Sequence, residues 1–374
     1  MDKSKKEISE KTAGGMDRRK FIAASGIGLA AMAAGGAAAV GKVEGEPERQ
    51  RRRRRGPGAQ QAPRSREEKL KQLASNSYAV NALFKRGGRA RPNQWKEKYG
   101  EITMLDFPQY TKDTYPGVTA MDLWSSLFGE DDDAQYVSRT AGRGEFDPST
   151  AAAKRYLDKL VAAMDKAGVQ AMHISNNAPR NIADLDEESR KEGIRVAKVW
   201  LDGCKQLGIA SMRVNTGGPR IVAPAVIKGG YPQNLEIVPF MKNCIESFKE
   251  MADYGEKVGV KVTIENHWGL AAHPMNIRII INEVNSPFCE ASPDFCNWEH
   301  EYMLYHGLEV LAPLATSMIH AKRWSRYPDV DIARCTEVLN KANYQGYISL
   351  EYEAGGDPVA GTLKLMNDVV AALR

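Results

Sequence analysis

Hydrophobic and polar residues follow two alternating patterns from about residue 68 to the end of the chain. Short apolar runs rich in β-branched residues are typical of buried strands, whereas longer segments with apolar residues every three to four positions are typical of helices. The segment Pro148 to Lys166 shows the second pattern, and Gly168 ends it before the apolar run Val169 to Ile174. The pattern therefore predicts strands that alternate with helices.

The alternation gives eight strand-like runs. They are Leu73 to Val80, Val118 to Trp124, Val169 to Ile174, Ile209 to Val214, Val260 to Ile264, Phe288 to Ala291, Thr316 to Ile319 and Tyr347 to Leu350. The helices are expected at Leu105 to Tyr115, Pro148 to Lys166, Leu185 to Leu207, Glu236 to Val258, Met275 to Val284, Glu299 to Leu311, Asp331 to Ala342 and Pro358 to Leu373. Doubly wound sheets usually stop at about six strands, so the count favours one (β/α)8 TIM barrel over residues 68–374.

Residues 1–40 have the composition of an export signal. Charged residues lead into Asp17-Arg18-Arg19-Lys20-Phe21-Ile22, an Ala/Gly-rich run follows, and Ala37-Ala38-Ala39 offers a small-residue cleavage site. This order resembles a twin-arginine signal peptide, which implies export of the folded protein to the periplasm or another extracytoplasmic space. The alternative is an uncleaved membrane anchor, which four glycines and low hydrophobicity between Ala23 and Ala39 disfavour. No stable membrane span is therefore expected after processing.

Residues 41–67 are predicted to form a disordered basic linker. They hold Arg51 to Arg55, three prolines and almost no apolar residue that could offset the entropy of ordering. Residues 1–66 carry 16 Lys and Arg against 7 Asp and Glu, a balance of +9, so the remainder (36 against 40) is at −4 although the whole chain is at +5. An alternative role for the arginines is contact with an anionic surface polymer or phospholipid. The acidic barrel gives no reason to expect nucleic acid at its active site.

Four metal-binding residue types follow successive predicted strands. Glu265, Asp294, His320 and Glu351 lie at the carboxyl ends of the fifth to eighth runs. The carboxyl ends of barrel strands meet at one face, so these side chains are expected to converge on a single divalent cation. Three oxygen ligands and one imidazole suit Mn²⁺, Mg²⁺ or Co²⁺, with Zn²⁺ as a further candidate.

The five cysteines are widely spaced, which argues against a disulfide framework. Cys289 and Cys296 bracket Asp294 and are alternative ligands, although thiolates favour closed structural zinc sites. The Gly217-Gly218 and Gly229-Gly230 pairs lack any nucleotide-binding context. They are interpreted as flexible loops, and no nucleotide cofactor is expected.

With these residues in place, the chain from about Leu73 to Arg374 resembles the xylose isomerase-like sugar isomerase/epimerase superfamily. The matching pieces are Glu265-Asn266-His267, Asp294-Phe-Cys-Asn297, His320-Ala-Lys322 and Gly346-Tyr-Ile-Ser-Leu-Glu351-Tyr-Glu353. The resemblance implies that Glu265, Asp294, His320 and Glu351 bind the metal, that the two glutamates also move protons, and that Lys322 contacts substrate. The group includes ketose epimerases, inositol-pathway isomerases and dehydratases, and lyases on oxidised sugars. The insert from Gly129 to Asp147 and the export signal depart from its compact members and disfavour a sugar phosphate.

This residue set suits proton abstraction beside a sugar carbonyl. A metal on the carbonyl and the adjacent hydroxyl oxygen stabilises the enediolate, and Glu265 and Glu351 can act as base and acid. His267, two residues past Glu265, is a further candidate for proton transfer. The first hypothesis is an epimerase or isomerase for a keto-sugar or cyclitol. The same site would act as a 3-keto-glycoside lyase if the enolate expelled a β-substituent.

Several residues at the ends of the predicted strands or in the segments after them are candidates for substrate binding. They are His173, Asn176, Arg213, Asn215, Trp268, Asn297, Lys322 and Arg323. A salt bridge is the alternative for Arg213, and loop packing is the alternative for Trp268 and for three other tryptophans, Trp124, Trp298 and Trp324.

Three further functions stay open at this point. An abasic-site endonuclease shares the fold but would need more histidines than the six present. A metal-free hydrolase could use Glu265 and Glu351, and an exported sugar-binding barrel would need no catalysis. Under the first hypothesis the expected partner is a small-molecule sugar and no nucleic acid, and a homo-oligomer is compatible with the sequence.

Overall fold

The computed structural model describes residues 64–85, 93–129, 137–138, 145–219 and 236–374. The predicted export signal, nearly all of the predicted linker, the Gly229-Gly230 pair and much of the Gly129 to Asp147 insert lie outside them. No helix among the described residues is long and apolar enough to cross a membrane.

The first described element is the short helix α2 (Arg66–Leu70), so the predicted boundary between linker and barrel falls inside it. The Ser65 side chain accepts a hydrogen bond from the Glu68 backbone N–H, and the Glu68 side chain accepts one from the Ser65 backbone N–H. This capping box is a Ser-x-x-Glu spacing that the sequence already contained.

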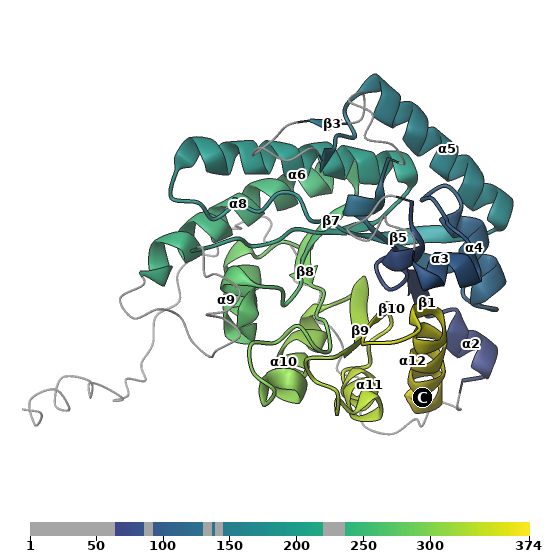
Figure 1. Ribbon diagram of the computed structural model, residues 1–374. Coiled ribbons are helices and arrows are strands. Elements are labelled where there is room, and N and C mark those ends of the chain that lie inside the picture. Colours follow the sequence, from purple (N-terminus) through teal and green to yellow (C-terminus); the bar gives the residue numbers. More distant parts are fainter. Residues whose placement is uncertain (1–63, 86–92, 130–136, 139–144, 220–235) are drawn as a thin grey trace, which may run out of the picture. The chain divides into compact units, whose positions relative to one another are not determined.

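Eight parallel strands form the barrel in the predicted order along the chain (Figure 1). They are β1 (Leu73–Asn76), β2 (Ala120–Trp124), β5 (Gln170–Ser175), β6 (Ser211–Arg213), β7 (Lys261–Ile264), β8 (Cys289–Ala291), β9 (Met318–Trp324) and β10 (Tyr347–Glu353). The sheet runs β8-β7-β6-β5-β2-β1-β10-β9. Between its two ends, Phe295 N donates to His320 O at 3.0 Å and His320 N donates to Pro293 O at 2.9 Å. A short bridge after β8 therefore joins the sheet ends.

The last two strands are longer than the hydrophobic pattern predicts. β9 and β10 continue beyond Ile319 and Leu350, where the predicted strands end. Their charged continuations still pair in parallel, with Lys322 opposite Glu351. Because side chains alternate between the two faces of a strand, this extension decides which polar residues point into the barrel.

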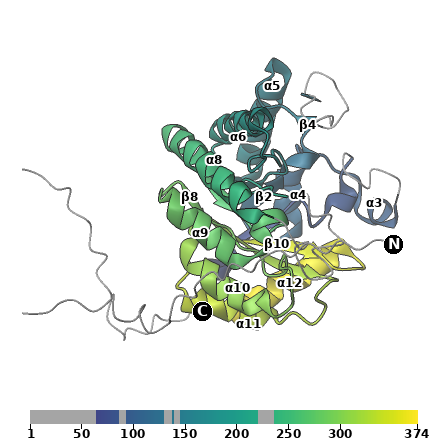
Figure 2. The ribbon, with the colours of Figure 1, turned by 90° about the vertical axis from the view of Figure 1, so that its left-hand side faces the viewer.

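Helices cover the outside of the strands, as two perpendicular views show (Figures 1 and 2). They are α3 (Gln94–Tyr99), α4 (Phe107–Thr114), α5 (Ala151–Ala167), α6 (Glu187–Leu207), α8 (Ile237–Val258), α9 (Pro274–Val284), α10 (Met303–Leu311), α11 (Ile332–Lys341) and α12 (Pro358–Ala372). Helix α3 and the two-stranded β3 (Val137–Ser138) and β4 (Glu145–Phe146) ribbon were not expected from the sequence. Their strands and helix are short, so the hydrophobic period carries little signal.

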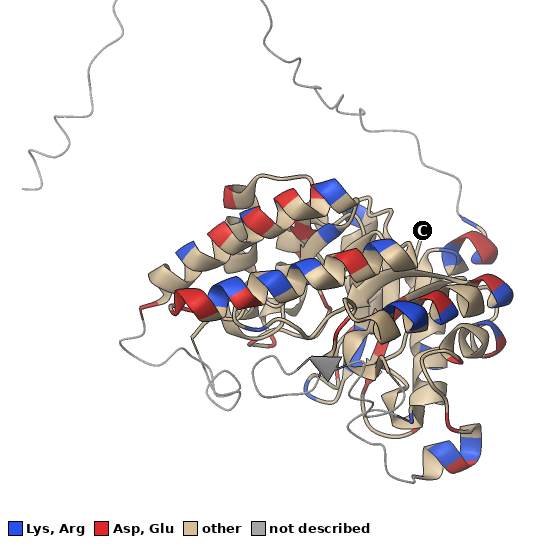
Figure 3. Cartoon of the chain, turned by 90° about the horizontal axis from the view of Figure 1, so that it is seen from above, with Lys and Arg blue, Asp and Glu red and all other residues tan. Residues whose placement is uncertain are grey.

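The outer faces of the helices carry acidic and basic residues side by side (Figure 3). Pairs such as Lys191 with Glu187, at 2.6 Å, follow the helical i, i+4 spacing. The chain closes on itself at the start and end of the barrel, where α2 lies beside α12 and Arg66 donates to Asn367 at 2.8 Å. These contacts hold the first described helix against the last one.

Candidate functional site

The four residues predicted as metal ligands converge in space. One ligand atom each from Glu265, Asp294, His320 and Glu351 lies within 4.8 Å of the others, and all four residues are buried. Glu265 follows β7, Asp294 lies in the bridge after β8, and His320 and Glu351 lie within β9 and β10. We call these four residues the carboxylate cluster.

Asp294 is held so that one of its oxygens faces the cluster without a partner. Its Oδ1 accepts hydrogen bonds from the backbone N–H groups of Cys296, at 2.5 Å, and Asn297, at 2.8 Å. The Asn266 side chain makes two hydrogen bonds to the Asp294 backbone. It accepts from the Asp294 N–H at 2.6 Å and donates to the Asp294 carbonyl at 3.0 Å. The other carboxylate oxygen of Asp294, Oδ2, is buried with no hydrogen-bond partner. Burial raises the pKa of Asp294 to about 8, and the neighbouring Glu351 and Glu265 add to the rise.

Glu265 lies against a buried arginine. Its two carboxylate oxygens accept from Arg213 Nη1 at 2.5 Å and from Asn297 Nδ2 at 2.7 Å. Burial on its own would raise the pKa of Glu265, but the positive charges of Arg213 and His320 outweigh it and hold the pKa well below its usual range. Glu265 is therefore an ionised carboxylate.

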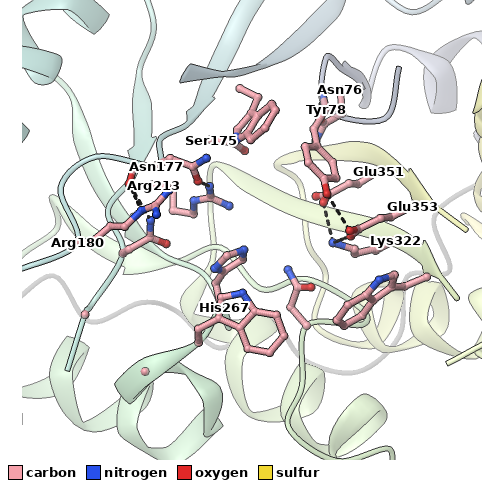
Figure 4. A pocket seen from close by; sticks show the side chains of 17 residues that line it. Asn76, Tyr78, Ser175, Asn177, Arg180, Arg213, His267, Lys322, Glu351 and Glu353 are labelled. Carbon is pink, nitrogen blue, oxygen red and sulfur yellow. Dashed lines mark hydrogen bonds and ion pairs between the residues drawn. The ribbon is translucent and has the colours of Figure 1, made fainter. Parts of the chain in front are cut away.

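Glu351 belongs to a second charged network. The Lys322 ammonium donates to Glu351 at 2.7 Å and lies 2.6 Å from Glu353, which also accepts from the Tyr78 hydroxyl at 2.7 Å. Burial by itself would lower the pKa of Lys322, but Glu351, Asp294 and Glu353 raise it. Lys322 is thus a fixed cation between two glutamates, as Figure 4 shows.

His320 has two ring nitrogens in different surroundings. Nε2 lies 2.9 Å from Asp122 Oδ2, whereas Nδ1 has no hydrogen-bond partner and lies 3.8 Å from Glu265 Oε2. Burial alone would lower the pKa of His320, but Glu265 and Asp122 raise it to about 9. Asp122 was missed by the sequence analysis. It lies in the middle of the apolar run Ala120–Trp124, where no strand end draws attention to it.

The cluster fits a divalent cation on its own chemistry. Three carboxylates crowd a buried space, and two ligand atoms, Asp294 Oδ2 and His320 Nδ1, are buried there without hydrogen-bond partners. Unsatisfied buried polar atoms are rare in folded proteins unless an ion or water completes them. Oxygen-rich sites with one imidazole are the kind that Mn²⁺ and Mg²⁺ use.

A cavity of about 420 Å³ opens over the cluster. Glu351 reaches it directly, and four half-buried aromatic side chains line it: Tyr78, Trp124, Trp268 and Trp324. We call these four the aromatic rim. They form two edge-to-face pairs, Tyr78 with Trp124 at 4.8 Å between ring centroids and Trp268 with Trp324 at 6.1 Å. Arg213, Asn177 and Arg180 lie on the side of the cavity opposite Tyr78 and Lys322 (Figure 4).

Besides Glu351, six of the residues predicted to touch substrate or move protons line this cavity. They are Arg213, Asn215, His267, Trp268, Asn297 and Lys322. Burial, helped by the charge of Arg213, lowers the pKa of His267 to about 3, so its imidazole is neutral. The cavity also takes polar residues that the sequence analysis did not select: Asn76, Tyr78, Ser175, Asn177, Arg180 and Glu353.

Four predicted candidates lie away from the cavity. His173 is fully buried against Ser211, with Nδ1 2.8 Å from its hydroxyl, and Asn176 accepts from the backbone of Ala178 in the loop after β5. Trp298 is fully buried in the core and donates to the Phe295 carbonyl at 3.1 Å. Arg323 forms an ion pair with Asp368 of α12 at 3.0 Å. His173, Asn176 and Arg323 therefore do not line this cavity, and the alternative packing role fits Trp298.

Strand periodicity explains the Arg323 error. His320, Lys322 and Trp324 alternate with Ala321 and Arg323 along β9, so the first set faces the barrel interior and Arg323 faces the helix outside. The same rule brings Glu353 to the cavity two positions after Glu351. The predicted end of the strand at Ile319 hid this alternation.

Close backbone packing explains why glycines occupy positions 217 and 218. Gly217 has φ +62°, and a Cβ there would lie 2.5 Å from the Arg180 carbonyl oxygen. Gly269, also with positive φ, would place a Cβ 2.1 Å from the Gly217 carbonyl oxygen. Loops that follow β5, β6 and β7 therefore touch backbone to backbone beside the cavity, which only glycine allows. Gly217 and Gly218 do lie in a loop, as the sequence indicated, and their close contacts give them a packing role there.

Comparisons with known proteins agree with this architecture. No curated protein matches the chain. Among solved structures, a 3-keto-D-glucoside 4-epimerase from E. coli has a TM-score of 0.55 at 14% identity, covering 80% of this chain and 98% of its own. An L-ribulose 3-epimerase has a TM-score of 0.56 at 12% identity, with 80% and 95% covered. A xylose isomerase-like protein from Mycobacterium smegmatis in complex with magnesium has a TM-score of 0.51 at 13% identity, with 81% and 97% covered.

At these identities the structural likeness establishes the fold alone. The sequence match is more specific, because residues 133–369 fit the profile described as Xylose isomerase-like TIM barrel. That segment contains all four members of the carboxylate cluster and most of the cavity lining. The chain therefore belongs to the xylose isomerase-like TIM barrel family.

Proposed function

We propose that the protein is a divalent-metal-dependent sugar isomerase or epimerase that acts through an enediolate. The observation that carries the proposal is the carboxylate cluster, in which Asp294 Oδ2 and His320 Nδ1 have no hydrogen-bond partner. The epimerases among the structural neighbours support sugar chemistry for this barrel.

Glu265, Asp294, His320 and Glu351 would hold the cation. When bound, it would stabilise the negative charge that develops on the substrate oxygens by several kcal/mol. The neighbour in complex with magnesium supports a hard divalent ion, and Mn²⁺, Mg²⁺ and Co²⁺ all suit the ligand set.

The two glutamates are suited to opposite proton transfers because their surroundings differ. Glu265 is kept ionised by Arg213, while Glu351 lies on the cavity wall beside the Lys322 ammonium. One can remove the proton next to the substrate carbonyl and the other can return a proton on the opposite face. Lys322 and the neutral His267 are placed to donate hydrogen bonds to substrate hydroxyls or to pass a proton.

The aromatic rim supports a substrate with an exposed ring. Tyr78, Trp124, Trp268 and Trp324 offer apolar faces on which a sugar can stack while Asn215 and Asn297 bind its hydroxyls. A keto-sugar or cyclitol without phosphate is the proposed substrate class.

Elimination from a 3-keto-glycoside is the second candidate on the same residues. The neighbour described as a 3-keto-D-glucoside 4-epimerase supports this substrate class, although its own reaction is an epimerisation. The aromatic lining of a cavity of about 420 Å³ can take an aglycone as well as a sugar. Export by the twin-arginine route also stays part of this proposal, since free glycosides are found outside the cytoplasm.

The deciding experiment uses the purified chain loaded with Mn²⁺ in D₂O. D-Allulose, D-tagatose, L-ribulose and a 3-keto-glucoside are supplied, and mass spectrometry follows deuterium uptake while chromatography follows configuration and aglycone release. Deuterium uptake with a change in configuration supports the epimerase, and aglycone release supports the lyase. Activity that survives exhaustive chelation would instead favour a metal-free hydrolase and would remove the cation from the proposal.

A further inference from the structure

Asp122 is a fully buried carboxylate outside the carboxylate cluster, and it collects hydrogen bonds from three sides. Its oxygens accept from Ser175 Oγ at 2.9 Å, from Ser349 Oγ at 2.8 Å and from Asn76 Nδ2 at 3.1 Å. The donors come from β5 and β1, which pair with β2, and from β10, the next strand beyond β1. Burying a charge costs free energy unless the charge is paired and hydrogen-bonded, and donors from three strands meet that requirement for Asp122.

The remaining partner of Asp122 is His320. Asp122 Oδ2 lies 2.9 Å from His320 Nε2, so the carboxylate, which only accepts hydrogen bonds, needs an N–H at that nitrogen. In the neutral ring the lone pair must then reside on Nδ1. That is the atom without a hydrogen-bond partner that faces Glu265 and the rest of the cluster.

We propose that Asp122 is the positioning residue for His320. It fixes the tautomer and the ring orientation that present Nδ1 to the cation, and Ser175, Ser349 and Asn76 hold Asp122 in place. This inference rests on the proposed cation site. Carboxylates that bind the far nitrogen of a ligand histidine commonly raise metal affinity by about 10- to 100-fold.

A second cation is the competing interpretation of the same residues. Ligand atoms of Asp122, His173 and His320 also lie within 4.8 Å of one another, and His173 Nε2 is buried with no hydrogen-bond partner. A cation there would have to bind His320 through Nε2. His320 would then serve two cations through both nitrogens and lose both ring protons, while Asp122 would give up its hydrogen bond from the ring. The positioning role requires neither.

The test measures Mn²⁺ binding by wild type, Asp122→Asn and the control His173→Gln, all of the full chain stripped of metal. Affinity comes from competition with a metallochromic chelator, and stoichiometry comes from elemental analysis. Wild type is expected to bind one equivalent, Asp122→Asn to bind one equivalent about 10- to 100-fold more weakly, and His173→Gln to stay within about 3-fold of wild type. Thermal unfolding without metal separates loss of affinity from loss of fold.

A spectroscopic readout adds a measurement that a purely structural role would not change. The visible absorption of bound Co²⁺ is expected to differ between wild type and Asp122→Asn, because the imidazole ligand changes its orientation, and to be unchanged in His173→Gln. If Asp122→Asn does not fold, Ser349→Ala replaces it. That variant removes one hydrogen bond from Asp122 and is expected to weaken Mn²⁺ binding measurably, although by less than about 10-fold.

Each contrary outcome has a distinct meaning. Equal affinity in wild type and Asp122→Asn, or in Ser349→Ala where it stands in, overturns the positioning role and leaves the proposed function intact. Two equivalents in wild type, with one lost in both Asp122→Asn and His173→Gln, overturns it in favour of a second metal centre. No binding by wild type removes the proposed function together with this inference.

Discussion

The carboxylate cluster and the aromatic rim meet at one cavity but are built on different principles. The cluster is fully buried, lies on or next to strands β7 to β10, and is held by charge-assisted hydrogen bonds such as Arg213 to Glu265 at 2.5 Å. The rim is half-buried and comes from strand ends and the loops after them. The charged side chains of the cluster are therefore buried and hydrogen-bonded, whereas the aromatic side chains of the rim need only offer a ring face to the cavity.

The network around the cluster also shows how the barrel tolerates so many acids. Arg213 neutralises Glu265 on one side, and Lys322 neutralises Glu351 and Glu353 on the other. Removing one member of a buried pair leaves an uncompensated charge, so the cluster should respond to substitution with large losses. The rim should respond with small losses, since each ring is only one of four aromatic faces at the cavity.

The largest expected effect is on turnover, from Glu351→Gln. Losing a general acid or base costs about 10²- to 10⁴-fold in kcat, while the amide keeps the shape of the side chain and so the fold. Deuterium exchange into the active keto-sugar measures the rate, and circular dichroism checks the fold. Glu353→Gln is the matched control and should retain far more activity. Wild-type turnover in Glu351→Gln would take the residue out of the reaction.

Lys322→Met should cause the next largest loss, in stability. The methionine leaves Glu351 and Glu353 buried or half-buried without their cation, at a cost of about 3–5 kcal/mol in the free energy of unfolding. Urea unfolding of the metal-free protein measures it. The double variant Lys322→Met/Glu353→Gln should recover part of the loss, because one of the two unpaired charges is gone. Full stability in the single variant would mean that Lys322 does not balance the cluster.

Acid should destabilise the region beneath the cluster through His173. Burial lowers the pKa of His173 from 6.5 to about 4, so the unfolded chain takes up its proton first as the pH falls. The stabilisation is present above about pH 6.5 and is lost on the way down to about pH 4, by an amount on the order of 3 kcal/mol.

Urea unfolding of the metal-free protein between pH 7 and pH 4 measures this slope. His173→Gln should flatten it, because the variant has no imidazole to protonate, whereas His300→Gln, on a partly exposed side chain, should not. A His173→Gln profile parallel to wild type would contradict the assignment.

On the rim, Trp268→Ala should raise KM and leave kcat unchanged. A stacked aromatic contact contributes about 0.5–1.5 kcal/mol, which corresponds to an increase in KM of about 2- to 10-fold. Steady-state kinetics on the preferred keto-sugar provides the measurement, with Trp268→Phe as the variant that keeps a ring. A loss confined to kcat would place Trp268 in the chemistry and blur the distinction between rim and cluster.

Arg323→Ala should have the smallest effect. The side chain pairs with Asp368 on the helix side of β9, so KM should stay within about 2-fold and the free energy of unfolding should fall by at most about 1 kcal/mol. Steady-state kinetics and urea unfolding measure the two effects. A strong rise in KM would show that the strand phase deduced for β9 is wrong.

The barrel and the four members of the carboxylate cluster were predictable from the order of residues along the chain. Helix and strand periods are local properties of the chain, so all eight strands and their helices were predicted in the right order. The cluster was predictable because Glu265, Asp294, His320 and Glu351 interrupt or follow apolar runs, where a buried acid or imidazole stands out. Their convergence within 4.8 Å then follows from the parallel order of the strands.

The polar residues that surround that cluster could not be predicted in the same way, because they come from strands far apart in the chain. Asp122 reaches His320 across the barrel interior from a position 198 residues away in the chain, and no local pattern encodes such a contact. Arg323, His173 and Asn176 were misplaced because strand phase and loop path depend on how far β5 and β9 extend, and that is set by pairing with neighbouring strands. The spacing of hydrophobic residues determines where helices and strands form, whereas the direction of each polar side chain depends on the neighbouring residues with which it forms hydrogen bonds or ion pairs.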